Sequence, residues 1–162
     1  MEALAERKIV EQQEKYLAFI LGNEIYGIEI LRVREIIGLM DVTTVPQTPE
    51  YMKGVINLRG KVIPVIDLRL KFLMQEEEHT KETCVIVVEV NSTSIGIIVD
   101  SVSEVMEIKS GEIEESLSFG QGIDTDYIMG MGKIKEKIII LLDIEAVLSS
   151  EELEVVKEHA VE

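Results

Sequence analysis

The sequence repeats itself, and this duplication constrains the fold more than any single motif does. Segment 54–72, GVINLRGKVIPVIDLRLKF, aligns without a gap with segment 130–148, GMGKIKEKIIILLDIEAVL. Segment 25–37, IYGIEILRVREII, aligns in the same way with segment 94–106, SIGIIVDSVSEVM. The second copy carries extra residues between its two matching blocks. A repeat with so long a period indicates one structural unit built twice.

Each copy consists of short β-branched segments separated by turn-forming residues. Apolar residues make up 46% of the chain and aromatic residues 4%, so Ile, Val and Leu must fill the interior, and this composition favours strands. The expected strands are 16–21, 24–30, 34–39, 54–58, 61–66, 84–90, 94–99, 104–108, 127–134 and 137–142. About five short strands per copy suffice to close a small barrel without free edges. The sequence predicts a mainly β fold of two pseudo-symmetric five-stranded SH3-like, Greek-key barrels packed together, with a few short helices.

The predicted boundaries follow the two copies. Residues 14–74 are assigned to the first barrel and 83–148 to the second, within one domain whose barrels can exchange segments. The acidic run at 75–82 forms the linker between them. Residues 1–13 are expected to be flexible or weakly helical, and 149–162 to form a C-terminal helix and tail.

Helix starts are indicated at three positions. Asp67 and Asp143 each follow a strand and precede an apolar stretch, which is typical of an N-cap carboxylate that accepts hydrogen bonds from free backbone N–H groups. Ser149 and Glu152 have the spacing of a capping box that opens the C-terminal helix.

The charge balance excludes several classes of partner. The 31 acidic residues outnumber the 16 Lys and Arg residues, and the formal net charge of −15 repels nucleic acids and anionic membrane surfaces. The single cysteine, Cys84, cannot form an internal disulfide or a multi-thiolate metal site. The sequence contains no uninterrupted apolar run of membrane-spanning length, and its first residues are charged. We therefore expect a cytoplasmic protein that does not insert into membranes directly.

The sequence offers little material for catalysis. His79 and His159 have no neighbouring ligand for a zinc site, and no phosphate-binding glycine loop is present. We expect no catalytic residue, cofactor or metal. The alternative is a small-molecule-binding or enzymatic double barrel that uses Asp67, Asp100 and Asp143 at strand ends.

The two copies differ where a partner could bind. Arg59 lies in a hairpin turn of the first copy, as either a solvated turn residue or an interface anchor for a partner carboxylate. The segment 28–37 has too many apolar residues for one inward face, whether it is a helix or a strand. The surplus residues either fill the boundary between the barrels or line a groove for an amphipathic helix, and both can hold together.

Several motifs in fixed order give the chain a family resemblance. The segments YGIEILRVREII and VPQTPEYMKGVINLRGKVIPVIDLRLKF closely resemble chemotaxis coupling proteins of the CheW family, and GIIVDSVSEVM and LLDIEAVL in the second copy extend the similarity. The resemblance covers about 16–147. It implies two intertwined SH3-like barrels and a non-catalytic adaptor that joins the regulatory domain of the histidine kinase CheA to the cytoplasmic tip of methyl-accepting chemotaxis receptors. An isolated CheA regulatory domain is the alternative within this fold.

The resemblance also implies which residues bind each partner. The receptor-binding set comprises Leu17, Ile30, Val33, Glu35, Ile36, Gly54, Arg59 and Val102. Leu17, Ile30, Val33, Ile36 and Val102 of this set would line an apolar groove between the barrels. Phe119, in the extra residues of the second copy, resembles an exposed aromatic position at the interface with the kinase or within receptor-array rings.

Overall fold

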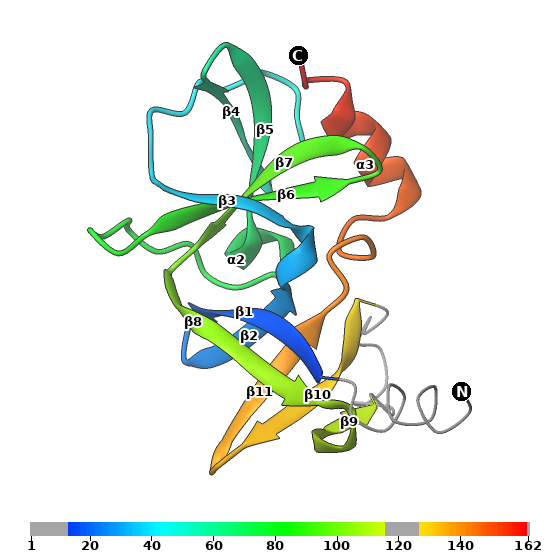
Figure 1. The fold of residues 1–162 in the computed structure, drawn as a ribbon. Helices are drawn as coiled ribbons and strands as arrows, with labels where there is room; N and C mark the ends of the chain where they lie inside the picture. Colours follow the sequence, from blue (N-terminus) through cyan, green and yellow to red (C-terminus); the bar gives the residue numbers. More distant parts are fainter. Residues whose placement is uncertain (1–12, 116–126, 162) are drawn as a thin grey trace.

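The computed structural model describes residues 13–115 and 127–161 (Figure 1). In chain order the elements are β1 (Gln13–Leu21), β2 (Glu24–Glu29), the 3-10 helix η1 (Ile30–Arg32), β3 (Val33–Gly38), β4 (Met52–Leu58), β5 (Lys61–Asp67), α2 (Leu68–Lys71), β6 (Cys84–Val90), β7 (Thr93–Val99), β8 (Ser101–Lys109), the 3-10 helix η2 (Ser110–Glu112), β9 (Ile113–Glu115), β10 (Ile128–Ile134), β11 (Lys137–Leu142) and α3 (Ser150–Lys157). Every expected strand is present, β6 and β11 with the expected bounds and the others with shifted ends, and β9 is an additional short strand within the extra residues of the second copy. The mainly β fold with few helices is confirmed.

Neither sheet is made from one sequence copy alone. Among the described residues, sheet A has the order β8-β1-β2-β11-β10-β9 and sheet B has the order β3-β6-β7-β5-β4. The repeat aligns β1 with β6, β2 with β7, β3 with β8, β4 with β10 and β5 with β11, so sheet B repeats the order of sheet A with the copies interchanged. Each copy therefore gives its first two strands to the other barrel. The contiguous ranges 14–74 and 83–148 do not coincide with the two sheets.

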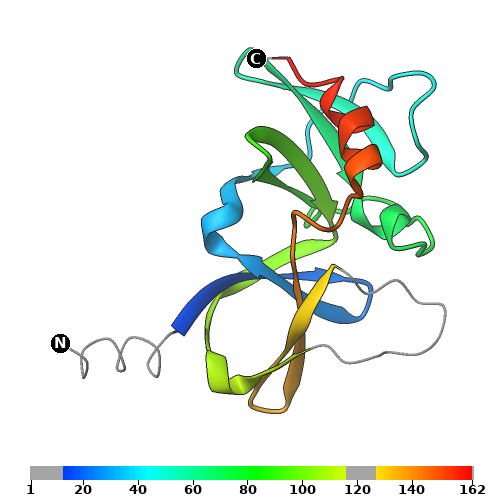
Figure 2. The same cartoon turned by 90° about the vertical axis from the view of Figure 1, so that its right-hand side faces the viewer.

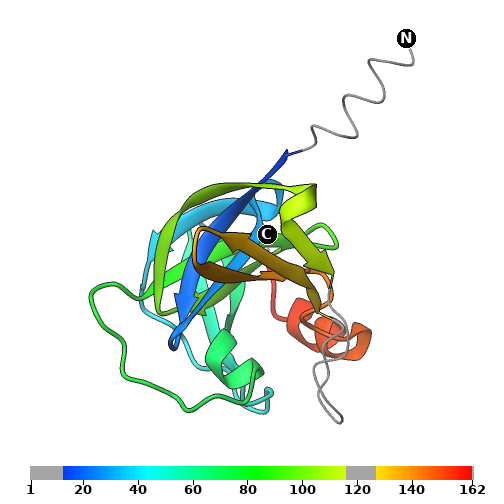
Figure 3. The same ribbon diagram turned by 90° about the horizontal axis from the view of Figure 1, so that it is seen from below.

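The two barrels lie one above the other. In Figures 1 and 2 the barrel of sheet B lies above that of sheet A, and α3 packs beside the upper barrel. Figure 3, seen from below, looks onto the barrel of sheet A. The expected N-terminal segment 1–13 lies outside the described residues except for Gln13, which begins β1.

Two aligned glycines, Gly27 and Gly96, lie where the exchanged strands β2 and β7 pair with β11 and β5. Val65 lies opposite Gly96 in the parallel β5–β7 pair, and Leu141 lies opposite Gly27 in the parallel β11–β2 pair. A Cβ atom on Gly96 would lie 2.8 Å from a side-chain carbon of Val85, and one on Gly27 would lie 3.1 Å from a side-chain carbon of Leu141. The glycines therefore allow a close approach that a side chain would block.

The interior consists of a shared core between the barrels and a smaller core within each. The core within the barrel of sheet B is formed by Ile56, Ile63, Val65, Val85, Val87 and Ile98, and that within sheet A by Tyr16, Ile108, Ile139 and Leu141. The shared core takes residues from both sheets and from α3, including Leu17, Phe19, Ile86, Ile97 and Leu153. The exchanged strands β1 and β6 contribute to the shared core with one face and to a barrel core with the other. Burial on both faces explains their almost continuous apolar sequence.

The predicted helix caps are confirmed at two of three positions. The Asp67 carboxylate accepts a hydrogen bond from the Arg69 backbone N–H at 2.9 Å, so Asp67 is the N-cap of α2. Ser149 and Glu152 form the expected capping box at the start of α3, which buries Leu153 and Val156. The prediction for Asp143 is wrong, because this carboxylate accepts from the Glu145 backbone N–H within a turn, and residues 144–148 are not helical. Ile144, Val147 and Leu148 instead enter the shared core.

No helix within residues 13–115 and 127–161 has the length and apolar character needed to cross a bilayer.

Candidate docking surface

Two chain segments cross from one sheet to the other. The first runs from β2 through η1 to β3, and the second runs from β7 through Asp100 to β8. Both β3 and β8 lie at the edge of their sheets, beside the shared core. The repeat aligns the two crossings, so they are equivalent positions of the duplicated unit.

A β-bulge in β3 divides the predicted receptor-binding residues between two faces. The pairing of β3 with β6 shifts register between Val33 and Glu35. Val33 and Ile36 consequently pair with Val88 and Ile86, which face the shared core. Glu35 instead pairs with Val87, whose side chain faces the barrel interior. Because a bulge interrupts the alternation of side chains, Val33 and Ile36 share one face of β3 while Glu35 lies on the other.

The same arrangement recurs in β8 and identifies a residue that the sequence analysis missed. Val102 pairs with Phe19 and Val105 with Leu17, across a register shift in the β1–β8 pair. Val102 and Val105 align in the repeat with Val33 and Ile36. The outer member of each pair is exposed, Ile36 to 43% and Val105 to 50%. The alignment of Val105 with Ile36 in the repeat could have identified this residue from the sequence.

We call the apolar surface at the edge of the shared core the docking seam. It comprises Ile30, Val33, Ile36, Val102 and Val105, which lie on η1 and on the edge strands β3 and β8. Ile30, Val33 and Val102 are half-buried against the shared core, whereas Leu17 is only 2% exposed and lies beneath this surface. Leu17 therefore supports the seam in this conformation and does not form part of its surface.

The structure brings Glu35 and Arg59 together. The Arg59 side chain is 70% exposed and forms an ion pair with Glu35, which is 32% exposed. The pair borders a surface hollow of about 390 Å³ whose lining residues are Arg34, Glu35, Leu58, Arg59, Lys61, Ile63, Val87 and Ser94. Arg59 has a φ of 53° in the β4–β5 turn, a left-handed conformation that a tight hairpin turn requires.

Gly54 does not form part of this surface. Gly54 is buried, and a Cβ atom there would lie 2.1 Å from the backbone oxygen of Thr43. Its role in the structure is to admit Thr43, which exchanges backbone hydrogen bonds of 2.8 and 2.9 Å with Val55. Phe119 lies outside the described residues.

The apolar surplus of segment 28–37 is exposed at two positions. Ile28 is buried in the shared core, whereas Leu31 in η1 is 92% exposed and Ile36 is 43% exposed. A hollow of about 360 Å³ beside η1 is lined by Glu14, Lys15, Glu29, Ile30 and Leu31. Burial, together with the nearby Glu14 carboxylate, raises the pKa of Glu29.

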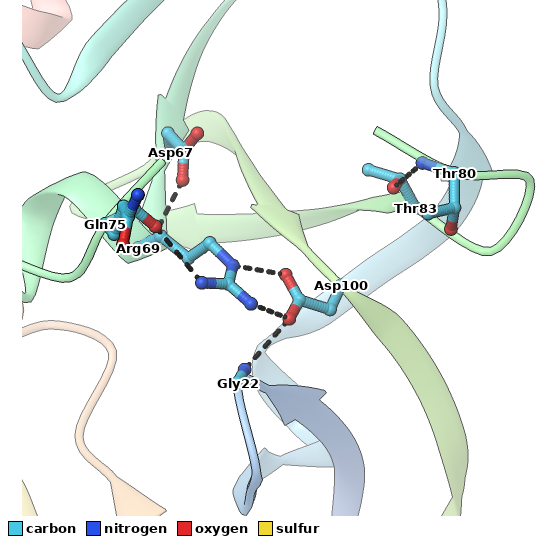
Figure 4. A network of polar contacts seen from close by, with 7 residues as sticks. All are labelled: Gly22, Asp67, Arg69, Gln75, Thr80, Thr83 and Asp100. Atoms are coloured by element: carbon cyan, nitrogen blue, oxygen red, sulfur yellow. Dashed lines mark hydrogen bonds and ion pairs between the residues drawn. The ribbon is translucent and has the colours of Figure 1, made fainter. Parts of the chain in front are cut away.

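Each of the three aspartates of the alternative small-molecule site accepts hydrogen bonds within the protein, and Asp67 and Asp100 are joined through Arg69. Asp67 caps α2, and burial raises the pKa of its carboxyl group. Asp100 binds the Arg69 guanidinium and the Gly22 backbone N–H (Figure 4). Asp143 closes the turn after β11. Within the described residues, no group of three or more His, Cys, Asp or Glu side chains is placed to hold a metal ion.

Comparison with known proteins decides the family. The family model of the CheW-like domain matches residues 15–152. The chain belongs to the CheW-like family. A chemotaxis protein CheW from Klebsiella aerogenes is 44% identical over 143 residues, which cover 88% of this chain and 86% of that protein. A chemotaxis protein CheW from Helicobacter pylori is 36% identical over 155 residues, with 93% and 92% coverage.

A solved structure extends the comparison to the CheW-like fold. The crystal structure of the scaffolding protein TtCheW from Thermoanaerobacter tengcongensis superposes with a TM-score of 0.80 at 35% identity, covering 87% of this chain and 96% of that one. The comparisons confirm the resemblance and the two-barrel fold that the sequence predicts. They also confirm the expectation of a chemotaxis adaptor.

Proposed function

We propose that this CheW-like chain is a non-catalytic coupling protein that binds the regulatory domain of the histidine kinase CheA and the cytoplasmic tip of methyl-accepting chemotaxis receptors. It acts in the cytoplasm and is recruited to receptor arrays through these partners. The observation that carries the proposal is the docking seam on β3 and β8, together with the Glu35–Arg59 ion pair on the other face of β3. Family membership supports the adaptor role.

The seam suits one face of an amphipathic receptor helix. Ile30, Val33 and Ile36 offer apolar contacts, and the exposed Arg59 and Glu35 side chains set the register of the bound helix. Burial of about 600–1,000 Å² of total surface would give a weak individual contact. Many such contacts within an array would supply the net strength through avidity.

The test reverses the charge of Arg59 in the β4–β5 hairpin and, as a control, that of Lys135 in the aligned β10–β11 hairpin. Arg59→Glu places a second carboxylate beside that of Glu35 on β3, so binding of a receptor fragment should weaken at least tenfold. Lys135→Glu is the matched control, because Lys135 aligns with Arg59 and also has a positive φ, 57° against 53°. Binding is measured by co-sedimentation with receptor-bearing membranes and by calorimetry, and thermal unfolding verifies the fold.

A second measurement tests coupling itself. The CheA regulatory domain and a receptor fragment are titrated onto the protein separately and then together. A coupling protein must bind both partners at once, so the ternary complex should form. Mutual exclusion, or equal receptor binding by Arg59→Glu and the unaltered protein, would contradict the proposal.

A further inference from the structure

The polar junction around Asp100 connects the two barrels at the second crossing (Figure 4). The Asp100 carboxylate accepts hydrogen bonds from the Arg69 Nε and Nη2 atoms at 2.7 and 2.5 Å. It also accepts one from the Gly22 backbone N–H at 2.8 Å. Arg69 belongs to α2, which follows sheet B, whereas Gly22 lies in the β1–β2 turn of sheet A. One carboxylate therefore ties an element of each barrel to the start of β8.

Further contacts hold this junction from both sides. The Asp100 backbone N–H donates to the carbonyl oxygen of Ile20 at 3.1 Å, and Arg69 Nη1 donates to that of Gln75 at 3.1 Å. The Arg69 backbone N–H is fixed by the Asp67 cap. Although burial opposes ionisation, the hydrogen bonds from Arg69 and Gly22 prevail and hold the pKa of Asp100 below its usual value. A bidentate guanidinium–carboxylate pair fixes orientation as well as distance.

The equivalent crossing is held much less tightly. Glu145 aligns with Arg69, and Leu31 aligns with Asp100, so the first crossing lacks the central carboxylate. Arg32 and Glu145 form a single hydrogen-bonded ion pair there, with side chains 41% and 46% exposed. The Arg69 and Asp100 side chains are only 14% and 30% exposed. Because solvent screens exposed ion pairs, the Asp100 junction contributes more to the relative placement of the barrels.

We propose that Arg69 and Asp100 are positioning residues, which fix the orientation of β8 relative to β3 and thereby the shape of the docking seam. Asp100 lies directly before β8, two residues before Val102. A shift of β8 would change the spacing between Val102 and Val33, which lie on different sheets. This inference rests on the proposed function for its binding consequence, but its structural consequence can be measured without any partner.

The first experiment measures the distance between the barrels by spin-label spectroscopy. Labels are attached at Lys61→Cys and Lys137→Cys, which are exposed, aligned positions at the starts of β5 and β11. Cys84, the single native cysteine, is replaced by serine. Asp100→Ala should broaden or shift the distance distribution, and Asp100→Asn, which keeps an acceptor oxygen, should have a smaller effect. Glu145→Gln, at the equivalent crossing, should leave the distribution unchanged.

The second experiment measures affinity for the receptor fragment. Asp100→Ala should weaken binding about 2- to 30-fold, the range expected for mutations that act on a binding site through connected structure. Ile56→Val is the control for lost stability, because it removes a buried methyl group from the core within the barrel of sheet B and leaves the junction and the shared core intact. It should lower the midpoint of thermal unfolding but change neither the interbarrel distance nor the affinity.

The outcomes separate the inference from the proposed function. Unchanged distances in Asp100→Ala would overturn the inference, as would altered distances with unchanged receptor affinity, because Asp100 would then be structural only. Failure of the unaltered protein to bind either partner would overturn the proposed function instead. The distance measurement would still decide whether the junction sets the barrel orientation.

Discussion

At the scale of single residues, Asp67 combines a helix cap with an unfavourable buried charge. Its carboxylate caps α2, and its side chain is almost completely buried. Burial raises its pKa in the folded protein, so the folded state binds this proton more tightly than the unfolded state does. The charged form therefore reduces stability at neutral pH, and this loss is relieved as the pH falls through the raised folded pKa.

Two substitutions separate the cap from the charge. Asp67→Asn keeps the acceptor oxygen and removes the charge, so stability at pH 7 should be unchanged or higher. Asp67→Ala removes the cap as well and should cost about 1 kcal/mol. Urea unfolding between pH 3 and pH 7 provides the measurement, with Asp143→Asn as the control in the aligned, more exposed turn. A large loss of stability in Asp67→Asn at pH 7 would contradict this interpretation.

At the scale of elements, Gly54 determines how the 39–51 connection joins β4. It has a φ of 147°, and the Thr43 backbone occupies the space of a side chain. Gly54→Ala should therefore destabilise the protein by about 2–3 kcal/mol through strain and overpacking. Gly38→Ala, where no atom lies within 4 Å of the added Cβ, should leave stability unchanged or slightly higher.

Denaturant unfolding of both glycine variants tests this prediction and also clarifies the receptor-binding set. If Gly54→Ala loses receptor affinity only together with stability, Gly54 acts through the fold and is not a contact residue. If Gly54→Ala is as stable as the unaltered protein, the 39–51 connection can move away from the added methyl group. The close packing of Thr43 against Gly54 would then be unimportant for stability.

At the scale of the whole molecule, the repeat predicted the strands but could not assign their partners. β1 and β6 align in the repeat, and both are buried on two faces. Their apolar sequences would therefore be the same whether each strand stayed in the barrel of its own copy or moved to the other barrel. The β-bulge in β3 could not be predicted either, since a regular strand would place the side chains of Val33 and Glu35 on the same face. The proximity of Glu35 and Arg59 came only from the family resemblance. Val105, by contrast, could have been predicted from its alignment with Ile36.

The strand exchange makes a prediction about how the two halves depend on each other. The pairs β1–β8, β2–β11, β3–β6 and β5–β7 each join one copy to the other. A half separated from the rest of the chain would lose these strand partners and would expose the shared core to solvent. Neither half should therefore fold alone.

A protease site inserted after Glu78, in the exposed linker, tests this prediction. The cleaved chains should remain together during size-exclusion chromatography and keep their β-sheet circular dichroism, because cutting the linker breaks no strand pair. Each purified fragment should be unfolded by itself and regain structure when the two are mixed. The uncleaved protein, treated with the same protease without the inserted site, is the control. Two folded fragments that elute separately would mean that each copy forms its own barrel, and the exchanged topology would have to be abandoned.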